Sequence, residues 1–301
     1  MKKVLKAISA ICASCMVAAC GNLQVVKPAQ FPAQLSGSTV ELSSERPARS
    51  AVAPRSYEVP GHSMFFQQSS GGSVAVGLLL GPLGVIANRI NIDRLTDLMG
   101  KSGAQSSLYA IDALTEARTV WKTANPKSAD VPATTGKLIV QPYITLFTLD
   151  EKSGIFVVVS ARVESDQLAA DGNTKAWVGL YNYVVDGTLP VTALQASISQ
   201  EDMDKYRASI RAGYSEIRAE IESDLKGGKP PKRQIAWVKS PVLGVGLPGD
   251  VERSPSGRLS LRVSAKNMGL ATDPLFSYSV YVFPSANEYS FENGPVDREE
   301  K

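Results

Sequence analysis

Cysteine and histidine are the two residue types that this 301-residue chain has least of. Its three cysteines, Cys12, Cys15 and Cys20, all lie near the N-terminus, and His62 is its only histidine. A Ser-His-Asp arrangement would therefore have to use His62 as its base. Beyond residue 20 the chain has one histidine and no cysteine, which leaves mainly carboxylates as metal ligands there, and no stretch has the acid spacing of a calcium loop. We expect no bound metal and no cofactor.

An excess of charge of one sign is also absent after the N-terminus. The chain has 32 Lys and Arg against 29 Asp and Glu, and three of those lysines are Lys2, Lys3 and Lys6. Without these three the two signs balance. This balance gives no general argument for binding to nucleic acid or to an anionic membrane surface.

The N-terminus has the three parts of a secretory signal: a basic start, an apolar run and small residues before a cysteine. Within it, Val17-Ala18-Ala19-Cys20 resembles the lipobox of bacterial lipoprotein precursors, a resemblance confined to this N-terminal segment. It implies cleavage between Ala19 and Cys20, a diacylglyceryl group on the Cys20 sulfur and acylation of the freed amine. The alternative is an ordinary signal peptide or an uncleaved anchor, although the apolar run is shorter than the ~20 residues of a spanning helix.

The residue after the cysteine bears on the membrane that holds the protein. In enteric-type bacteria an Asp at that position retains a lipoprotein in the inner membrane, whereas Gly21 stands here. The resemblance therefore implies the periplasmic leaflet of the outer membrane, with the periplasmic side of the inner membrane as the alternative. The mature chain would keep only the lipidated Cys20, so its fold must be stable without a disulfide.

Two segments after the signal differ sharply in composition. Residues 21–61 contain five prolines and six serines with little apolar periodicity, which predicts a flexible tether or a loosely packed arm. As a coil of 41 residues it would span roughly 35 Å, and fully extended about 130 Å. Residues 74–87 are wholly apolar apart from glycine and proline, too few to span a bilayer. They are either core or a segment that contacts a partner or lipid.

Hydrophobic periodicity predicts the elements of an α+β fold. We expect an antiparallel sheet meander with a long amphipathic helix packed on it, and further strands towards the C-terminus. Pro142, within the first strand of the meander, indicates a sheet edge or a bulge. The predicted helices cover residues 104–124 and 200–226, and the predicted strands cover residues 137–149, 155–164, 176–185, 235–245, 258–266 and 275–283.

These elements suggest a domain organisation. We expect a signal peptide over residues 1–19, the tether over 20–61 and an α+β domain over 62–228. Residues 229–286 form a C-terminal β segment of the same or a second domain, and 287–301 a polar tail.

Several short motifs come near to enzyme signatures without meeting them. Residues 71–75 resemble a nucleophile elbow, but the fifth residue is Ala and the only histidine precedes the serine. The GKS of residues 100–102 lacks the first glycine of a phosphate loop, which would fall at Leu95. Glu164 and Asp166 are paired acids of the kind that glycosidases use. They lie at a strand end beside a loop, where solvated charge is the ordinary interpretation.

Three glycines, Gly244, Gly246 and Gly249, formally satisfy GxGxxG. The dinucleotide-binding form of this motif needs a helix that begins at the glycines. Residues 250–257 contain a proline and have no helical period, so we expect a turn between strands instead.

One constellation is a candidate contact site. Arg207, Arg211 and Arg218 fall on one side of the long predicted helix, beside its apolar stripe. They either extend over the sheet and pair with acids such as Glu222, or form a basic edge for a headgroup or an acidic partner.

We therefore expect a lipid-anchored envelope lipoprotein that faces the periplasm and acts in binding, assembly or scaffolding without catalysis. Its expected partners are the membrane, through the N-terminal lipid, and an envelope protein; its oligomeric state is left open. The alternatives are a carrier of lipid or a small apolar ligand and, third, a cell-wall hydrolase that uses carboxylates.

Overall fold

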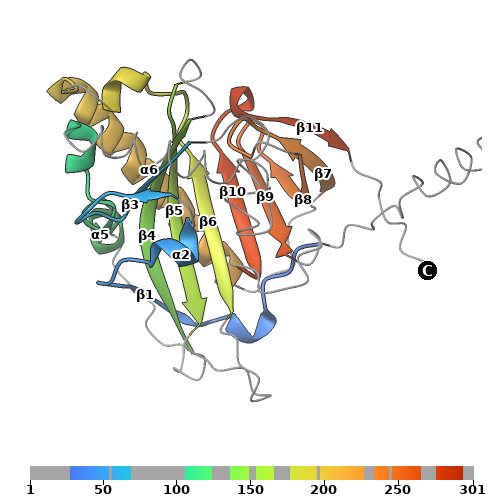
Figure 1. Cartoon of the computed structure of the whole chain (residues 1–301). Helices are drawn as coiled ribbons and strands as arrows, with labels where there is room; N and C mark the ends of the chain where they lie inside the picture. Colours follow the sequence, from blue (N-terminus) through green and yellow to red (C-terminus); the bar gives the residue numbers. More distant parts are fainter. Residues whose placement is uncertain are drawn as a thin grey trace, which may run out of the picture.

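The computed structural model describes residues 28–53, 56–68, 106–123, 136–148, 154–165, 177–194, 197–226, 234–243, 246–265 and 276–293 (Figure 1). Its strands are β1 (Thr39–Leu42), β2 (Tyr57–Glu58), β3 (Met64–Gln68), β4 (Lys137–Thr148), β5 (Phe156–Ser165), β6 (Val178–Val184), β7 (Gln234–Lys239), β8 (Leu247–Arg253), β9 (Leu259–Ser264), β10 (Tyr278–Phe283) and β11 (Ser290–Asn293). Its helices are α2 (Arg49–Val52), α5 (Ala113–Thr123) and α6 (Gln200–Leu225), with 3₁₀ turns η1 (Ala33–Leu35), η3 (Ser107–Ala110), η4 (Val191–Leu194) and η6 (Ala286–Glu288).

The described strands form one mixed sheet, which confirms the α+β class. The order is β11-β7-β8-β9-β10-β6-β5-β4-β3-β2, and β1 pairs with β4 outside this path. The predicted meander is present as the antiparallel strands β4, β5 and β6. Three neighbouring pairs are parallel, however: β1 with β4, β3 with β4, and β10 with β6. The prediction of an antiparallel sheet is therefore correct only in part.

Pro142 lies inside the sheet, where one edge of β4 changes partner. Along that edge β1 pairs with the first part of β4 and β3 with the last part. The Ser43 N–H donates to the Val140 oxygen and the Ile144 N–H to the Ser63 oxygen, both at 2.8 Å. Pro142 stands between these two bonds, where its missing N–H costs no ladder hydrogen bond. The expectation of a sheet edge holds only at Pro142 itself, because β1 and β3 pair with β4 on either side of it and β5 pairs along the other edge without a bulge.

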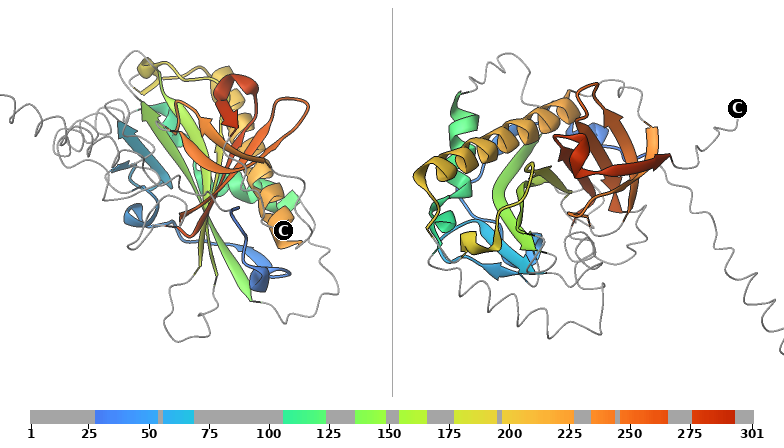
Figure 2. Two further views of the ribbon diagram at one scale, coloured as in Figure 1. Left: turned by 90° about the vertical axis from the view of Figure 1, so that its right-hand side faces the viewer. Right: turned by 90° about the horizontal axis from the view of Figure 1, so that it is seen from above.

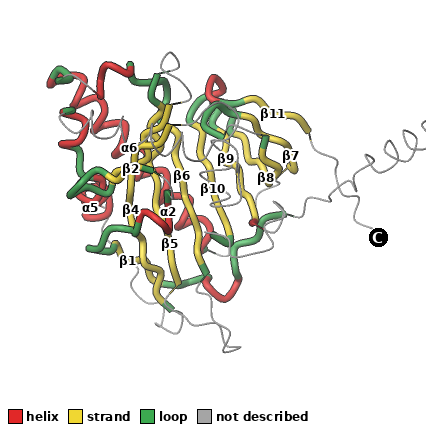
Figure 3. The backbone as a smooth tube through the Cα atoms, in the orientation of Figure 1, coloured by secondary structure: helices red, strands yellow, loops and turns green. Residues whose placement is uncertain are grey.

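The long helix α6 covers one face of the sheet, as predicted. It begins at a cap in which the Ser199 hydroxyl accepts the Asp202 N–H at 3.1 Å. Its apolar stripe is buried over β5 and β6 together with α5, on one side of the molecule (Figure 3). Gly213 allows the close approach, because a Cβ there would lie 2.9 Å from Tyr183 and 3.1 Å from Val159.

The predicted helix over residues 104–124 is shorter than expected. Residues Ser107–Ala110 form the 3₁₀ turn η3, and α5 follows as Ala113–Thr123. The Asp112 carboxylate accepts the Thr115 N–H at 3.0 Å and its hydroxyl at 2.6 Å. This capping interaction explains why the α-helix begins at Ala113 and not nine residues earlier.

The opposite face of β5 and β6 is also buried, because the C-terminal strands curve over it. Val158, Leu180 and Val184 point to that face and share a second apolar cluster with Val238 of β7 and Leu261 of β9. Seen from above, α6 lies along one side while the orange-to-red C-terminal strands curve away beyond its end (Figure 2, right panel). Strands β7, β8, β9 and β10 therefore continue the sheet of β4, β5 and β6 through the pairing of β10 with β6.

Strand β8 was missed by the sequence prediction, which placed a turn at the three glycines. Pro248 and Gly249 lie within this strand, and Gly244 lies outside the described residues. A Cβ on Gly249 would lie 2.3 Å from the backbone oxygen of Arg262, so the missing side chain lets β8 and β9 approach each other. The predicted strand over residues 235–245 correspondingly ends as β7 at Lys239.

Both predicted terminal segments contain structure. The tether prediction over residues 20–61 is wrong from residue 28 onwards, because β1 joins β4 while Ala29, Leu35 and Val52 are buried. Composition alone does not detect such isolated anchoring side chains. The polar tail over residues 287–301 is likewise wrong at its start, since residues 290–293 form β11 against β7.

Candidate functional site

The three arginines predicted from the sequence lie on α6 and pair with acids. Arg211 Nε donates to Glu116 Oε2 of α5 at 2.5 Å, and Arg207 Nε lies 3.8 Å from the other oxygen of Glu116. Arg218 Nε donates to Glu222 at 2.7 Å, the pairing expected from the sequence. The first two therefore join two helices rather than extending over the sheet. Their contact with a headgroup or an acidic partner stays a prediction.

The other candidate residues are scattered or lie outside the described residues. His62 is half-buried in the turn between β2 and β3, and Glu164 pairs with Arg162 on β5. Ala19, Cys20 and Asp166 lie outside the described residues. So do the segments 71–75, 74–87 and 100–102.

A buried cluster of charges, not predicted from the sequence, joins α6 to β9. Arg262 is 1% exposed, and its guanidinium donates to Glu220 and, from Nε, to Asp224 at 3.4 Å. The other Asp224 oxygen accepts the hydroxyls of Tyr278 at 2.9 Å and Tyr181 at 3.1 Å. Each carboxylate is thus held by at least two donors, as burial of a charge requires.

The surroundings in this cluster shift the pKa values of its two carboxyl groups in opposite directions. Burial favours the neutral form of Glu220, but Arg262, the Ser260 hydroxyl and Arg258 together hold the pKa of Glu220 below its ordinary value. Burial raises the pKa of Asp224, and Arg262 with the two tyrosine hydroxyls offsets only part of this effect. Every one of these groups is bound to another member of the cluster, so its evident role is to fix α6 on β9.

The N-terminal residues of the described chain are bound to strand β8. The Ala29 N–H donates to Asp250 Oδ2 at 2.5 Å, and both residues are buried. Two residues later, the Phe31 ring packs edge-on against Trp177, with ring centroids 5.2 Å apart, and against Tyr278 at 6.1 Å. The N-terminal arm is therefore fixed to the sheet from Ala29 onwards.

The outward surface of β7 carries the strongest candidate for a binding site. Ile235, Trp237 and Lys239 alternate with the buried Ala236 and Val238, so these three share one face of the strand, here called the β7 face. Trp237 is 39% exposed and is the exposed large hydrophobic side chain of the described residues. A tryptophan ring offers an apolar surface and a polar indole N–H to another molecule, so Trp237 is a candidate contact residue.

A hollow of ≈ 590 Å³ lies next to the β7 face. Gly246 joins the two features, because a Cβ there would lie 3.3 Å from the Lys239 stem and 3.5 Å from the Trp237 ring. The hollow is open, and both polar and apolar groups line it. Its lining comes from β7, β8 and the η6–β11 segment and consists of Lys239, Ser240, Pro241, Gly246, Asn287, Tyr289 and Ser290.

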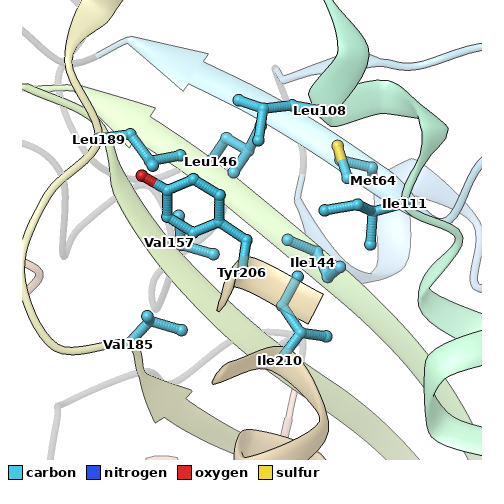
Figure 4. A pocket seen from close by; sticks show the side chains of 10 residues that line it. All are labelled: Met64, Leu108, Ile111, Ile144, Leu146, Val157, Val185, Leu189, Tyr206 and Ile210. Atoms are coloured by element: carbon cyan, nitrogen blue, oxygen red, sulfur yellow. The ribbon is translucent and has the colours of Figure 1, made fainter. Parts of the chain in front are cut away.

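A second, apolar cavity lies between the sheet, η3 and α6 (Figure 4). Tyr206 and Ile210 of α6 lie over Ile144, Leu146 and Val157 of the sheet in this view. Its volume is ≈ 10 Å³, about what one water molecule needs. The cavity is therefore too small for a lipid, and residues 74–85, which a carrier would also use, lie outside the described residues.

Among the described residues no group of three or more His, Cys, Asp or Glu side chains is placed to hold a metal ion, and no described helix is long and apolar enough to cross a membrane. No family model, curated protein or solved structure matches the chain.

Proposed function

We propose that the chain is a lipid-anchored lipoprotein of the bacterial envelope, held by Cys20 in the periplasmic leaflet of the outer membrane, whose role is binding or scaffolding rather than catalysis. The observation that supports the anchor most is the lipobox-like Val17-Ala18-Ala19-Cys20. The structural observation that bears on its geometry is the hydrogen bond from Ala29 to Asp250. It places a fixed point of the described fold only nine residues after the lipobox cysteine.

That short spacing gives the lipid a mechanical role. Nine residues reach at most about 30 Å even when fully extended, in place of the 130 Å of the longer tether expected from composition. A domain on so short a connection stays beside the leaflet that holds its acyl chains. Each buried methylene of those chains contributes roughly 0.8 kcal/mol, so three chains give effectively permanent attachment.

The surface of the domain supports a binding role. Trp237 is exposed beside an open hollow lined by both polar and apolar groups, an arrangement suited to a contact with another molecule. The buried acids Glu220 and Asp224, by contrast, are bound to the guanidinium of Arg262 and to neighbouring hydroxyls. We assign these acids to stability rather than to chemistry.

The test is replacement of the acylation site. Cys20→Ser removes the thiol but keeps the export signal, so the variant should no longer incorporate a palmitate analogue. Wild-type protein should label and remain in the envelope pellet after a high-salt wash. The mature-sized band of the variant should be soluble in the periplasm. If that unlabelled band still pellets and resists salt, or if wild-type protein does not label, the anchor proposal fails.

The binding role needs its own measurement. Chemical crosslinking in native envelopes should capture wild-type protein together with the same envelope protein in repeated preparations. Retention of a lipid by the purified protein would instead favour a carrier. Hydrolysis of purified cell wall would contradict the non-catalytic role.

A further inference from the structure

We propose that the β7 face docks on the surface of the lipid leaflet, with the Trp237 ring in the headgroup region, so that the domain meets the membrane at a second point besides its acyl chains. This inference rests on the proposed function, because the anchor at Cys20 is what brings the domain to the leaflet.

The register of the sheet puts the entry point of the chain and Trp237 on the same face. Ile235 of β7 is directly opposite Asp250 of β8, and directly opposed residues point to the same side. Trp237 lies two residues after Ile235, so it points to that side as well, about 7 Å along the strand. Asp250 holds Ala29 on this side through its carboxylate.

The length of chain before Ala29 then decides what this face can meet. Cys20 is nine residues away, a reach of at most about 30 Å. The acyl chains on Cys20 would therefore hold the face that carries Ala29 close to the leaflet. Helix α5, by contrast, lies at the far side of the molecule from β7 (Figures 1 and 2).

The side chains of the β7 face suit an interface between water and lipid. Tryptophan is enriched at the headgroup level because its ring is apolar and its indole N–H is polar. Lysine buries its stem along apolar surface while its ammonium stays among phosphates. Lys239 is exposed and lies beside Trp237. The adjacent hollow, with Ser240 and Asn287 in its lining, offers polar groups to a headgroup.

Depth-dependent fluorescence quenching tests the proposal on the full-length lipidated protein. A variant with Trp121→Phe and Trp177→Phe keeps Trp237 as its sole tryptophan. We would reconstitute it into vesicles of phosphatidylethanolamine and phosphatidylglycerol that contain a phospholipid brominated on its acyl chains. The reference is the same variant after proteolysis has removed its lipid anchor, measured in buffer without detergent. Relative to this reference, we expect the Trp237 emission of the vesicle-bound protein to shift to the blue. We also expect the brominated lipid to quench it.

A matched variant controls for proximity to the vesicle alone. Trp177→Phe with Trp237→Phe keeps Trp121, which packs on Tyr214 of α6 at the opposite side of the molecule. Its emission should be unchanged by bromine. Circular dichroism of both variants checks that the rings lost at positions 121 and 177 have not altered the fold.

The acyl chains on Cys20 are measured by mass spectrometry in the same samples. If Cys20 is acylated and Trp237 is no more quenched than Trp121, the docking proposal is wrong while the anchor stands. If Cys20 carries no acyl chain, both are wrong, because nothing then brings Ala29 near a leaflet. A photoreactive residue at position 237 that crosslinks in cells to a protein and not to lipid would likewise overturn docking on the membrane.

Discussion

Helix α6 is held to the sheet in two different ways along its length. Its first five turns pack through apolar side chains such as Ile210, Tyr214 and Ile217, which are at most 3% exposed, over β5 and β6. Its last turns bring Glu220 and Asp224 onto Arg262 of β9. Apolar burial is non-directional, whereas a buried ion pair is stable only with the right partners in place.

The difference suggests that the apolar end and the charged end of α6 contribute to its docking in different ways. The apolar end supplies most of the free energy that docks the helix, at about 1.5 to 3 kcal/mol for each fully buried side chain. The charged end selects the position of α6 relative to β9, because a shift along the helix would leave buried charges unpaired. Disrupting the apolar end should unfold the domain. Disrupting the charged end should destabilise the domain by an amount that depends on which charged partner is removed.

The largest effect is expected from a charge in the apolar end. Ile217 is fully buried, so Ile217→Asp loses its burial and places an unpaired carboxylate in the core. We expect destabilisation of about 4 kcal/mol or more, seen as loss of the cooperative urea transition. Ser215→Asp is the matched control, because Ser215 is exposed on the same turn of α6. An unchanged transition for Ile217→Asp would show that α6 does not dock through this stripe.

The next largest effect is expected at the charged end. Arg262→Met leaves Glu220 and Asp224 without their main cation, which should destabilise the domain by about 3 to 5 kcal/mol. Adding Glu220→Gln should recover part of this loss, because one buried charge disappears. Lys205→Met removes an exposed pair with Glu201 and should cost less than about 1 kcal/mol.

The opposite outcome for Arg262 would be as informative. If Arg262→Met and Lys205→Met lose equally little stability in urea titrations, the buried cluster contributes no more than a surface pair. If Glu220→Gln does not improve the Arg262→Met protein, the loss comes from the missing side-chain volume and not from unpaired charge.

A smaller effect is expected where β8 approaches β9. Gly249→Ala would place a methyl group 2.3 Å from the Arg262 oxygen, and backbone cannot move aside cheaply. We expect a loss of about 1 to 3 kcal/mol. Gly246→Ala meets only the flexible Lys239 stem at 3.3 Å and the Trp237 ring at 3.5 Å, so its melting temperature should change little. Equal melting temperatures for the two variants would contradict the close contact between the strands.

The sequence predicted those parts of the fold in which one face is buried and periodic. The apolar stripe of α6 and the alternation in β4, β5 and β6 follow from local patterns. Strand β8 was missed because Pro248 and Gly249 favour turns locally, while the approach of the Arg262 backbone that requires a glycine is a non-local property. The prolines of residues 28–61 hid β1 for the same reason.

The candidate sites show the same limit. Glu220 and Asp224 resemble the solvated acids of any surface helix, and Arg262 lies 42 and 38 residues away from them in the chain. Only the fold brings the three together. The one local trace of the β7 face is the alternation of Ile235, Trp237 and Lys239 with small or apolar residues, which marks Trp237 as an outward residue of a strand.

The smallest expected effect is a difference in how the two acids of the charged end, Glu220 and Asp224, change the stability of the domain with pH. Burial alone would raise the pKa of Glu220, but the charge of Arg262 is the main opposing effect, and the pKa is lowered in the folded protein. The ionised Glu220 therefore stabilises the fold above its unfolded pKa of about 4.3, and this contribution is lost as the pH falls through the folded value. The pKa of Asp224 is raised, so its contribution has the opposite sign. It is present below the unfolded pKa of about 3.9 and is lost as the pH rises through the folded value.

Urea unfolding between acid and neutral pH measures both contributions. Glu220→Gln should flatten the rise of stability with pH around pH 4, because the group that the folded state keeps ionised is gone. Asp224→Asn should steepen the same rise, because it removes the opposing group. Parallel curves for the two variants would show that their carboxyl groups titrate alike, and would contradict the separation that Arg262, the tyrosine hydroxyls and burial impose on them. The charged end of α6 would then act as a single pair of equivalent acids around one arginine, and the register of α6 on β9 would have to depend on Arg262 alone.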